Sequence, residues 1–427
     1  MADRFTRFPL QEGVNLFVQP TNKFKTTTVY IYFHMPLEPV TVTYNALLPM
    51  VLARATADFP STAALSRHLD ELYGASFSVD VARRGEVQSI VFRLEGAADQ
   101  HIPGEDGLLL RGLDVLASII TRPLLVGDGF KPEYVEQERT NLRQMIEGLI
   151  NDKRRYAMVR CTAEMCEGEP FALHRLGRVE DLEGVTPQSL LTHHRRVLTE
   201  APVDIFVLGN VDPEALVTEV SRRLPLPEAA RRFPPTLVKH RPDRPVREVV
   251  DRMDVNQGVV VIGFRTGITL RDELYFPMLV ANGVLGGFSH SKLFQEVRER
   301  NSLAYFAYSA IETVKGVGYM YAGVEFAAAE QCRAIMLEQL RALQEGRLTE
   351  AELEMTKATL INDMLSAADS PGAMAELAVD QVFSGRDLSI DERVARYRQV
   401  TREQVAEAAR HFTPDTVYVL TRKEGGA

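Results

Sequence analysis

The sequence has few cysteines, no excess of positive charge and no long apolar run. Its 427 residues contain 58 Asp and Glu against 49 Lys and Arg, which gives a formal net charge of −9. Without a strong basic field, we expect no nucleic-acid partner. No segment approaches the roughly 18 unbroken apolar residues of a membrane-spanning helix, and the first residues lack the apolar run and cleavage pattern of a signal peptide. These absences predict a cytoplasmic protein with no membrane partner.

The cysteines do not form a recognisable redox or zinc motif. Cys161, Cys166 and Cys332 are odd in number, and the first two have four residues between them. That spacing matches no common zinc knuckle or redox pair. We expect reduced, partly buried thiols.

The second half of the chain repeats the first. A single offset of 231 carries Phe33 to Phe264, Tyr44 to Tyr275, Leu48 to Leu279, Leu72 to Leu303 and Gly85 to Gly316. Each half reads as strands, then helices, then a last apolar strand. The pattern predicts an α+β protein made of two homologous halves, each with helices packed on a mostly antiparallel sheet, and with the halves facing across a cleft.

Composition places the domain boundaries. A chain of this length is too long for one ordinary core. Residues 223–246 are dense in proline and arginine and lack a helical period, which is typical of a semi-rigid linker. We therefore predict an N-terminal domain at 1–222 and a C-terminal domain at 247–427.

Residues 284–305 carry the most distinctive pattern. Gly286 and Gly287 favour a tight turn, after which an apolar helical period leads to Arg298 and an aromatic strand begins near Tyr305. A guanidinium and a phenol are donors that can hold a peptide carbonyl or its oxyanion. The alternative is a solvated cation at a helix end and a half-buried strand tyrosine.

This arrangement resembles the pitrilysin and insulinase type of zinc peptidase, and is most similar to the mitochondrial processing peptidase and its short bacterial relatives. The resemblance rests on the two repeated halves and on Gly-Gly-x-Ser-x-x-Lys-Leu-Phe-Gln-Glu-Val-Arg followed by Leu-Ala-Tyr. The family carries an inverted zinc motif, His-x-x-Glu-His, in the first helix of the first half. Matching backwards from Thr56, the three motif positions here are Ala46, Pro49 and Met50, none of which can bind zinc or take a proton.

The remaining candidates do not rebuild a metal site. The nine histidines are at positions 34, 68, 101, 174, 193, 194, 240, 290 and 411, and no two have the spacing of the inverted motif. We interpret His193 and His194 as a solvated helix face, and His68 with Glu71 as a surface contact. The resemblance implies that Glu136 or Glu138 is a relic of the third ligand. We therefore expect no metal or other cofactor in this chain.

The resemblance also implies that Arg298 and Tyr305 contact substrate near the scissile bond. Gly286, Gly287 and Ser289 would let a peptide backbone approach closely. In several two-chain family members one subunit holds zinc and the other keeps such substrate contacts. We therefore expect a non-catalytic subunit that binds peptide and forms a heterodimer with a zinc-bearing paralogue, which alone would hold the metal.

Three alternatives stay open. The first is an interaction or assembly protein that has lost proteolysis, as the core subunits of respiratory complexes in this family have; the family also links such bacterial chains to elongation factor P modification or peptide maturation. The second is a homodimer, which would have no zinc in either copy. The third is a peptidase that uses Ser289 and His290 as nucleophile and base, although no acid partner is evident.

Overall fold

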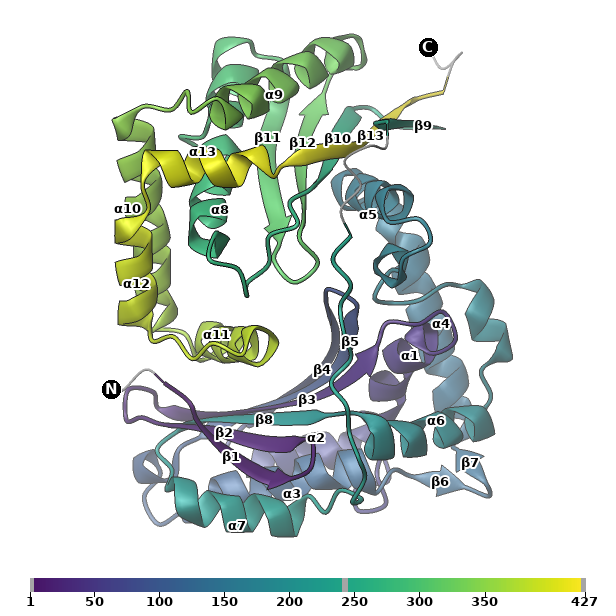
Figure 1. The fold of residues 1–427 in the computed structure, drawn as a ribbon. Helices are drawn as coiled ribbons and strands as arrows, with labels where there is room; N and C mark the ends of the chain where they lie inside the picture. Colours follow the sequence, from purple (N-terminus) through teal and green to yellow (C-terminus); the bar gives the residue numbers. More distant parts are fainter. Residues whose placement is uncertain (1–3, 240–244, 424–427) are drawn as a thin grey trace. The chain divides into compact units, whose positions relative to one another are not determined.

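The chain forms two compact units. The computed structural model describes residues 4–239 and 245–423 (Figure 1). Unit 1 comprises Met1–Glu147, Leu173–Pro235 and Ser370–Val379, and unit 2 comprises Gly148–Ala172, Thr236–Asp369 and Asp380–Ala427. The units depart from the predicted boundaries, because each contains a segment from the other half of the sequence and the linker is divided between them.

Unit 1 is built on a six-stranded sheet with the order β1-β2-β8-β3-β5-β4. The strands are β1 (Thr6–Gln11), β2 (Val14–Pro20), β3 (Thr26–Pro36), β4 (Ser76–Arg84), β5 (Val87–Ala97) and β8 (Val203–Gly209). Only β2 and β8 pair in parallel among these neighbours. Alternate side chains of β3, namely Val29, Ile31 and Phe33, enter the hydrophobic core. The strands predicted in this half are confirmed.

Helices cover the core face of this sheet. They are α1 (Val42–Leu52), α2 (Thr62–Glu71), α3 (Leu108–Thr121), α4 (Pro132–Glu147), α6 (Pro187–Glu200) and α7 (Pro213–Arg223), with a small hairpin of β6 (Leu125–Val126) and β7 (Gly129–Phe130). Ser61 caps α2 by accepting a hydrogen bond from the Ala64 amide at 3.2 Å. Thr186 begins α6 with a capping box, and Pro187 occupies its first turn.

Unit 2 repeats the sheet topology of unit 1. Its order is β11-β12-β10-β13-β9, with β9 (Arg247–Met253), β10 (Gly258–Arg265), β11 (Ala304–Glu312), β12 (Val317–Val324) and β13 (Thr413–Arg422). This matches β4-β5-β3-β8-β2, and β9 again pairs in parallel with β13. Gly85 and Gly316, related by the offset, both have positive φ in the corresponding hairpin turns. The predicted α+β repeat is confirmed.

The helices of unit 2 are α5 (Lys153–Met165), α8 (Tyr275–Asn282), α9 (Ala329–Gln344), α10 (Glu350–Ala367), α12 (Ile390–Gln399) and α13 (Arg402–Arg410), with π-helical segments η5 (Gly283–Gly287) and η6 (Phe294–Arg300). Helix α11 (Pro371–Ser384) begins in unit 1 and ends in unit 2. Short 3-10 turns lie at Asp99–His101, Gly148–Asn151, Pro170–Ala172, Glu180–Gly184 and Phe326–Ala328.

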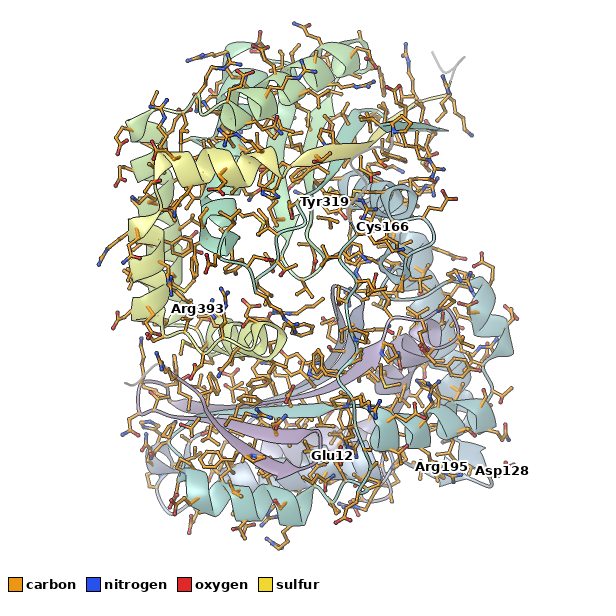
Figure 2. All side chains as sticks on the ribbon, in the orientation of Figure 1. Glu12, Asp128, Cys166, Arg195, Tyr319 and Arg393 are labelled. Carbon is orange, nitrogen blue, oxygen red and sulfur yellow. The ribbon has the colours of Figure 1, made fainter. Side chains whose placement is uncertain are left out.

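Each sheet is contacted by a helix from the opposite half of the sequence. Helix α5 packs on β10 and β13 of unit 2, and Thr162 bonds the hydroxyl of Tyr319, which Figure 2 labels, at 2.8 Å. Gly263 of β10 permits this approach, because a Cβ there would lie 2.8 Å from Met165 Sδ. In unit 1, the first part of α11 contacts β3 and β4, where Tyr32 and Arg84 donate hydrogen bonds to Glu376.

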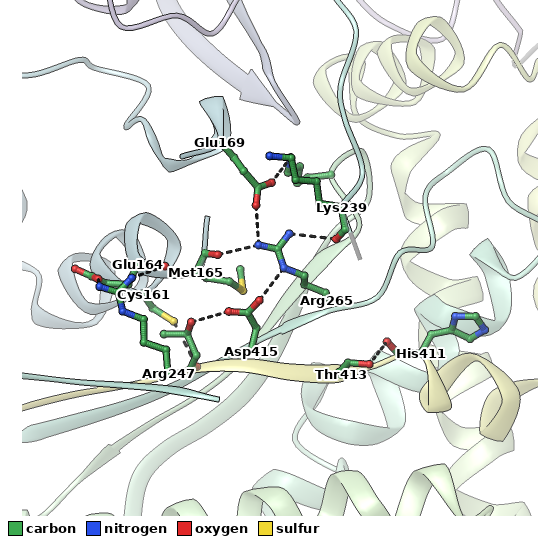
Figure 3. Close-up of polar contacts among 12 residues, drawn as sticks. Cys161, Glu164, Met165, Glu169, Lys239, Arg247, Arg265, His411, Thr413 and Asp415 are labelled. Atoms are coloured by element: carbon green, nitrogen blue, oxygen red, sulfur yellow. Dashed lines mark hydrogen bonds and ion pairs between the residues drawn. The ribbon is translucent and has the colours of Figure 1, made fainter. Parts of the chain in front are cut away.

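A buried ion-pair cluster of Glu169, Arg265, Lys315 and Asp415 fastens the segment after α5 to the sheet of unit 2. Figure 3 shows Arg265 between Glu169 and Asp415. Arg265 bonds Glu169 and Asp415, each at 2.8 Å, and the Lys315 ammonium lies 2.8 Å from Glu169. Cys161 and Cys166 lie nearby. All three cysteines are free and fully buried, deeper than the partial burial expected from sequence.

Candidate functional site

The zinc-motif positions inferred from the resemblance lie on α1. Ala46 is 2% exposed, Pro49 is buried and Met50 is half-buried. The helix continues through Pro49, whose carbonyl accepts from the Ala53 amide at 3.1 Å. A methyl, a pyrrolidine ring and a thioether offer no imidazole or carboxylate to a metal ion. These three side chains contribute packing to unit 1.

An arginine side chain of the protein pairs with the carboxylate that faces α1. Glu138 on α4 is 4% exposed, forms an ion pair with Arg54 in the turn that follows α1, and accepts a hydrogen bond from Asn141 Nδ2 at 3.0 Å. Glu136 instead pairs with Arg139 at 2.8 Å, and its side chain is 68% exposed. Glu138 is therefore the inward carboxylate of the two, and it is neutralised by a guanidinium, which cannot activate water as a metal does.

The interpretation of His193 and His194 as a solvated helix face is wrong. They are 7% and 4% exposed. His193 Nε2 lies 2.7 Å from Asn45 Oδ1, and His194 Nε2 lies 2.7 Å from the Ile120 carbonyl. Both follow the buried Leu190 by three and four positions, a helical spacing that could have placed them on the inner face. Burial, with the charges of Arg196 and His194, lowers the pKa of His193 to about 4.

No group of three or more His, Cys, Asp or Glu side chains that could hold a metal ion is found within residues 4–239 and 245–423. His68 Nδ1 lies 3.4 Å from Glu71 with both side chains partly exposed, which confirms the predicted surface contact. Within the same residues no helix is long and apolar enough to cross a membrane.

The glycine-rich stretch continues the helix, whereas the sequence predicted a tight turn. Gly286 and Gly287 lie in η5, directly after α8, and neither has a positive φ. Gly286 is required by space: an added Cβ would lie 2.5 Å from the Ser309 amide nitrogen of β11. The nearest atom to a Cβ on Gly287 would be 3.4 Å away. Close packing on β11 therefore accounts for Gly286, a reason that the sequence pattern did not disclose.

Arg298 and Tyr305 are both accessible. Arg298 lies in η6 with its side chain 43% exposed, and its guanidinium lies 4.7 Å from the centre of the Phe294 ring. Its Nε is 3.7 Å from Glu299 Oε1, a distance that gives only a weak ion pair. Tyr305 is 82% exposed, at an irregularity in the pairing of β11 between Ala304 and Phe306. Both donors of the predicted pair can thus reach a ligand.

The neighbouring Ser289 and His290 have local partners. Ser289 is exposed, and its carbonyl accepts from Gln295 Nε2 at 3.0 Å. His290 Nε2 lies 3.1 Å from Thr356 Oγ1, and its ring stacks on Phe288. Burial lowers the pKa of His290. The imidazole is directed to a threonine, which leaves the nucleophile-and-base alternative without geometric support.

The two units share one strand order, and the first helix of unit 1 offers no metal ligand at Ala46, Pro49 or Met50. Residues 184–360 match the family described as Peptidase M16 inactive domain. "Probable inactive metalloprotease YmfF" of Bacillus subtilis (strain 168) is 36% identical over 417 residues, which are 97% of this chain and 97% of the relative. The chain therefore belongs to the M16 peptidase family, as an inactive homologue.

Solved structures share the fold of this chain. A conserved protein from Enterococcus faecalis V583 superposes with a TM-score of 0.93 at 29% identity, over 99% of this chain and 100% of that one. A peptidase M16 inactive domain from Pseudomonas fluorescens superposes with a TM-score of 0.81 over 99% of both chains. At 16% identity, the second likeness concerns the fold alone.

Proposed function

We propose that this chain is a metal-free, non-catalytic subunit that binds peptide for a zinc-bearing paralogous subunit in a two-chain processing peptidase. The observation that carries the proposal is the contrast between the two candidate regions. The α1 positions Ala46, Pro49 and Met50 offer no metal ligand, whereas Arg298 and Tyr305 remain exposed. Because Tyr305 is 82% exposed, its phenol is free to reach a bound peptide.

The chemistry of the exposed pair suits a peptide under attack. As the partner's active site adds water to a peptide carbonyl, negative charge develops on its oxygen. The guanidinium of Arg298 and the phenol of Tyr305 can donate hydrogen bonds to that oxygen or to a neighbouring carbonyl. Loss of one such donor in other enzymes lowers turnover by about 100- to 1000-fold, which sets the upper limit for the effect here.

The zinc-bearing paralogue of the same organism provides the test. Neither chain alone should cleave a peptide mixture, the mixed chains should, and zinc should co-purify with the pair but not with this chain. Arg298→Ala should lower turnover while leaving assembly unchanged. Arg300→Ala is the matched control, since Arg300 is 71% exposed and pairs with Glu296 on the same segment. Tyr305→Phe tests the phenol.

The outcomes separate this proposal from its rivals. Full activity of the paralogue without this chain would refute it. Unchanged turnover with Arg298→Ala would favour a proteolysis-independent assembly role, including one in elongation factor P modification. The proposal also places the pair in the cytoplasm, which is compatible with the free thiols of Cys161, Cys166 and Cys332.

A further inference from the structure

A continuous row of aromatic rings begins beside Arg298 on unit 2. The ring of Phe294 lies 6.1 Å from that of Tyr308, Tyr308 lies 6.2 Å from Tyr321, and Tyr321 lies 6.2 Å from Phe306. Phe294 comes from η6, Phe306 and Tyr308 from β11, and Tyr321 from β12. We call these four rings the aromatic strip. Phe294 is buried at 9% exposure, whereas Phe306, Tyr308 and Tyr321 are half-buried, so these three rings present the accessible surface of the strip.

A guanidinium covers each end of the aromatic strip. Arg298 lies 4.7 Å from the centre of Phe294, and Arg154 of α5 lies 6.0 Å from the centre of Phe306. Arg154 is exposed. Burial raises the pKa of the Tyr321 phenol, and the charge of Arg154 opposes that rise. The strip is therefore apolar along its length and positive at both ends.

The dimensions and the position of the strip match an extended chain. Phe306 and Tyr308 lie two positions apart on β11, so their rings share one face at the roughly 6.6 Å spacing of alternate side chains in an extended chain, and Tyr321 of β12 lies opposite Tyr308. The strip also follows β11, which is the terminal strand in the order of its sheet. A terminal strand can accept main-chain hydrogen bonds from an added strand.

We infer that the aromatic strip binds an extended peptide segment with apolar or aromatic side chains at its centre and acidic groups toward its ends. The apolar side chains would lie on the rings, and the carboxylates would pair with Arg298 and Arg154. This inference rests on the proposed function, because it names the class of peptide that the subunit would hold. Arg154 is a binding residue in this account and takes no part in the chemistry.

Direct peptide binding by the isolated chain tests the inference. The chain contains no tryptophan, so the fluorescence of a short peptide with a central tryptophan reports on the peptide alone. One probe has aspartates at both ends, and a second has lysines in their place. We expect the aspartate probe to bind at least about fivefold more tightly, with the difference shrinking as salt is added.

Two variants on α5 provide the matched comparison. Arg154→Glu and Arg155→Glu change the net charge equally, at adjacent exposed positions, so long-range electrostatic effects are shared. Arg154→Glu should weaken the aspartate probe about fivefold, and Arg155→Glu should not. Arg298→Glu against Arg300→Glu repeats the comparison at the other end of the strip.

Equal binding of the two probes, or equal effects of Arg154→Glu and Arg155→Glu, would overturn the inference. A failure of the proposed function can be distinguished from a failure of this inference. If the mixed subunits never cleave peptide but the aspartate probe binds as expected, the strip stands without the peptidase partnership. If Arg154→Glu has no effect on binding while Arg298→Ala abolishes turnover, the partnership stands without the strip.

Discussion

Replacing Lys315 with methionine is expected to destabilise unit 2 strongly. Lys315 and Glu169 have side chains with 0% exposure and lie 2.8 Å apart, and the Lys315 ammonium also donates to the Leu237 carbonyl at 2.5 Å. Methionine fills a similar volume without the charge. Because Glu169 would lose one of its two buried cations, the variant removes a partner from a charge that cannot reach water.

The expected size follows from how much of the cluster remains. Breaking a buried ion pair from one side typically costs about 3–5 kcal/mol. Glu169 keeps its 2.8 Å contact with Arg265, so we expect the lower end, about 3 kcal/mol. For a unit of this size, that corresponds to a fall in Tm of about 6–12 °C. Lys315→Met combined with Glu169→Gln should cost less than the sum of the single changes, because the pair shares one interaction.

Urea unfolding followed by circular dichroism measures these free energies, provided that the transitions of the two units are fitted separately. Arg347→Met is the control, since Arg347 and Glu345 form an ion pair with side chains 60% and 61% exposed. That change should cost less than about 0.5 kcal/mol. A Lys315→Met variant as stable as the control, or a double variant that loses the full sum, would refute the reasoning.

Three further predictions concern charge and titration. Burial alone would raise the pKa of Glu169, but the ion pairs with Lys315 and Arg265 outweigh burial and lower that pKa. The stability that ionised Glu169 contributes is therefore present above its unfolded pKa of about 4.3 and is lost as the pH falls through its folded pKa. The difference in the free energy of unfolding between wild type and Glu169→Gln should narrow during acid titration. The pKa of His193 is about 4 in the fold against about 6.5 in the unfolded chain, so between these pH values the unfolded chain binds a proton that the folded chain does not. The free energy of unfolding should therefore fall by about 3 kcal/mol as the pH falls from about 6.5 to about 4. Histidine NMR should show His193 neutral down to about pH 5, and His193→Gln should lack this loss of stability. Arg54→Met leaves Glu138 buried without its guanidinium and should cost about 2–3 kcal/mol in urea unfolding, whereas an unchanged stability would mean that the pair contributes nothing.

Local patterns and the internal repeat were sufficient to predict much of the fold. The offset from Phe33 to Phe264 pairs two buried residues on β3 and β10, which occupy equivalent places in the two sheets. Ser61 and Thr186 cap helices α2 and α6, because their side chains accept hydrogen bonds from backbone amides that the helix itself leaves unpaired. These signals are local, so sequence carries them directly.

The packing of α5 on the sheet of unit 2 was not predictable in the same way. Helix α5 has an apolar face with Cys161 and Met165, but an apolar face does not specify which sheet buries it. Chain order suggests the first half, and the structure places it on the second. The small residue that receives it, Gly263, is recognisable only once the approach of Met165 is known.

The features of the candidate site that depend on residue type were predictable from the sequence, and those that depend on contacts between distant segments were not. Sequence could show that Ala46, Pro49 and Met50 cannot bind metal, because this depends on side-chain type alone. It could not show that Arg54 neutralises Glu138, since that pair joins the turn after α1 to α4 across 84 positions. Likewise the aromatic strip is assembled from three elements and has no contiguous signature.

The two candidate regions are built from separate sets of contacts, one in each unit. Zinc contributes folding free energy only where its ligands converge. In unit 1, the corresponding positions are stabilised by the apolar packing of Ala46 and by the Arg54–Glu138 ion pair. In unit 2, Arg298 is positioned by stacking on Phe294, and Tyr305 by the irregularity in β11. These contacts lie within unit 2, so the placement of Arg298 and Tyr305 requires no metal ligand on α1.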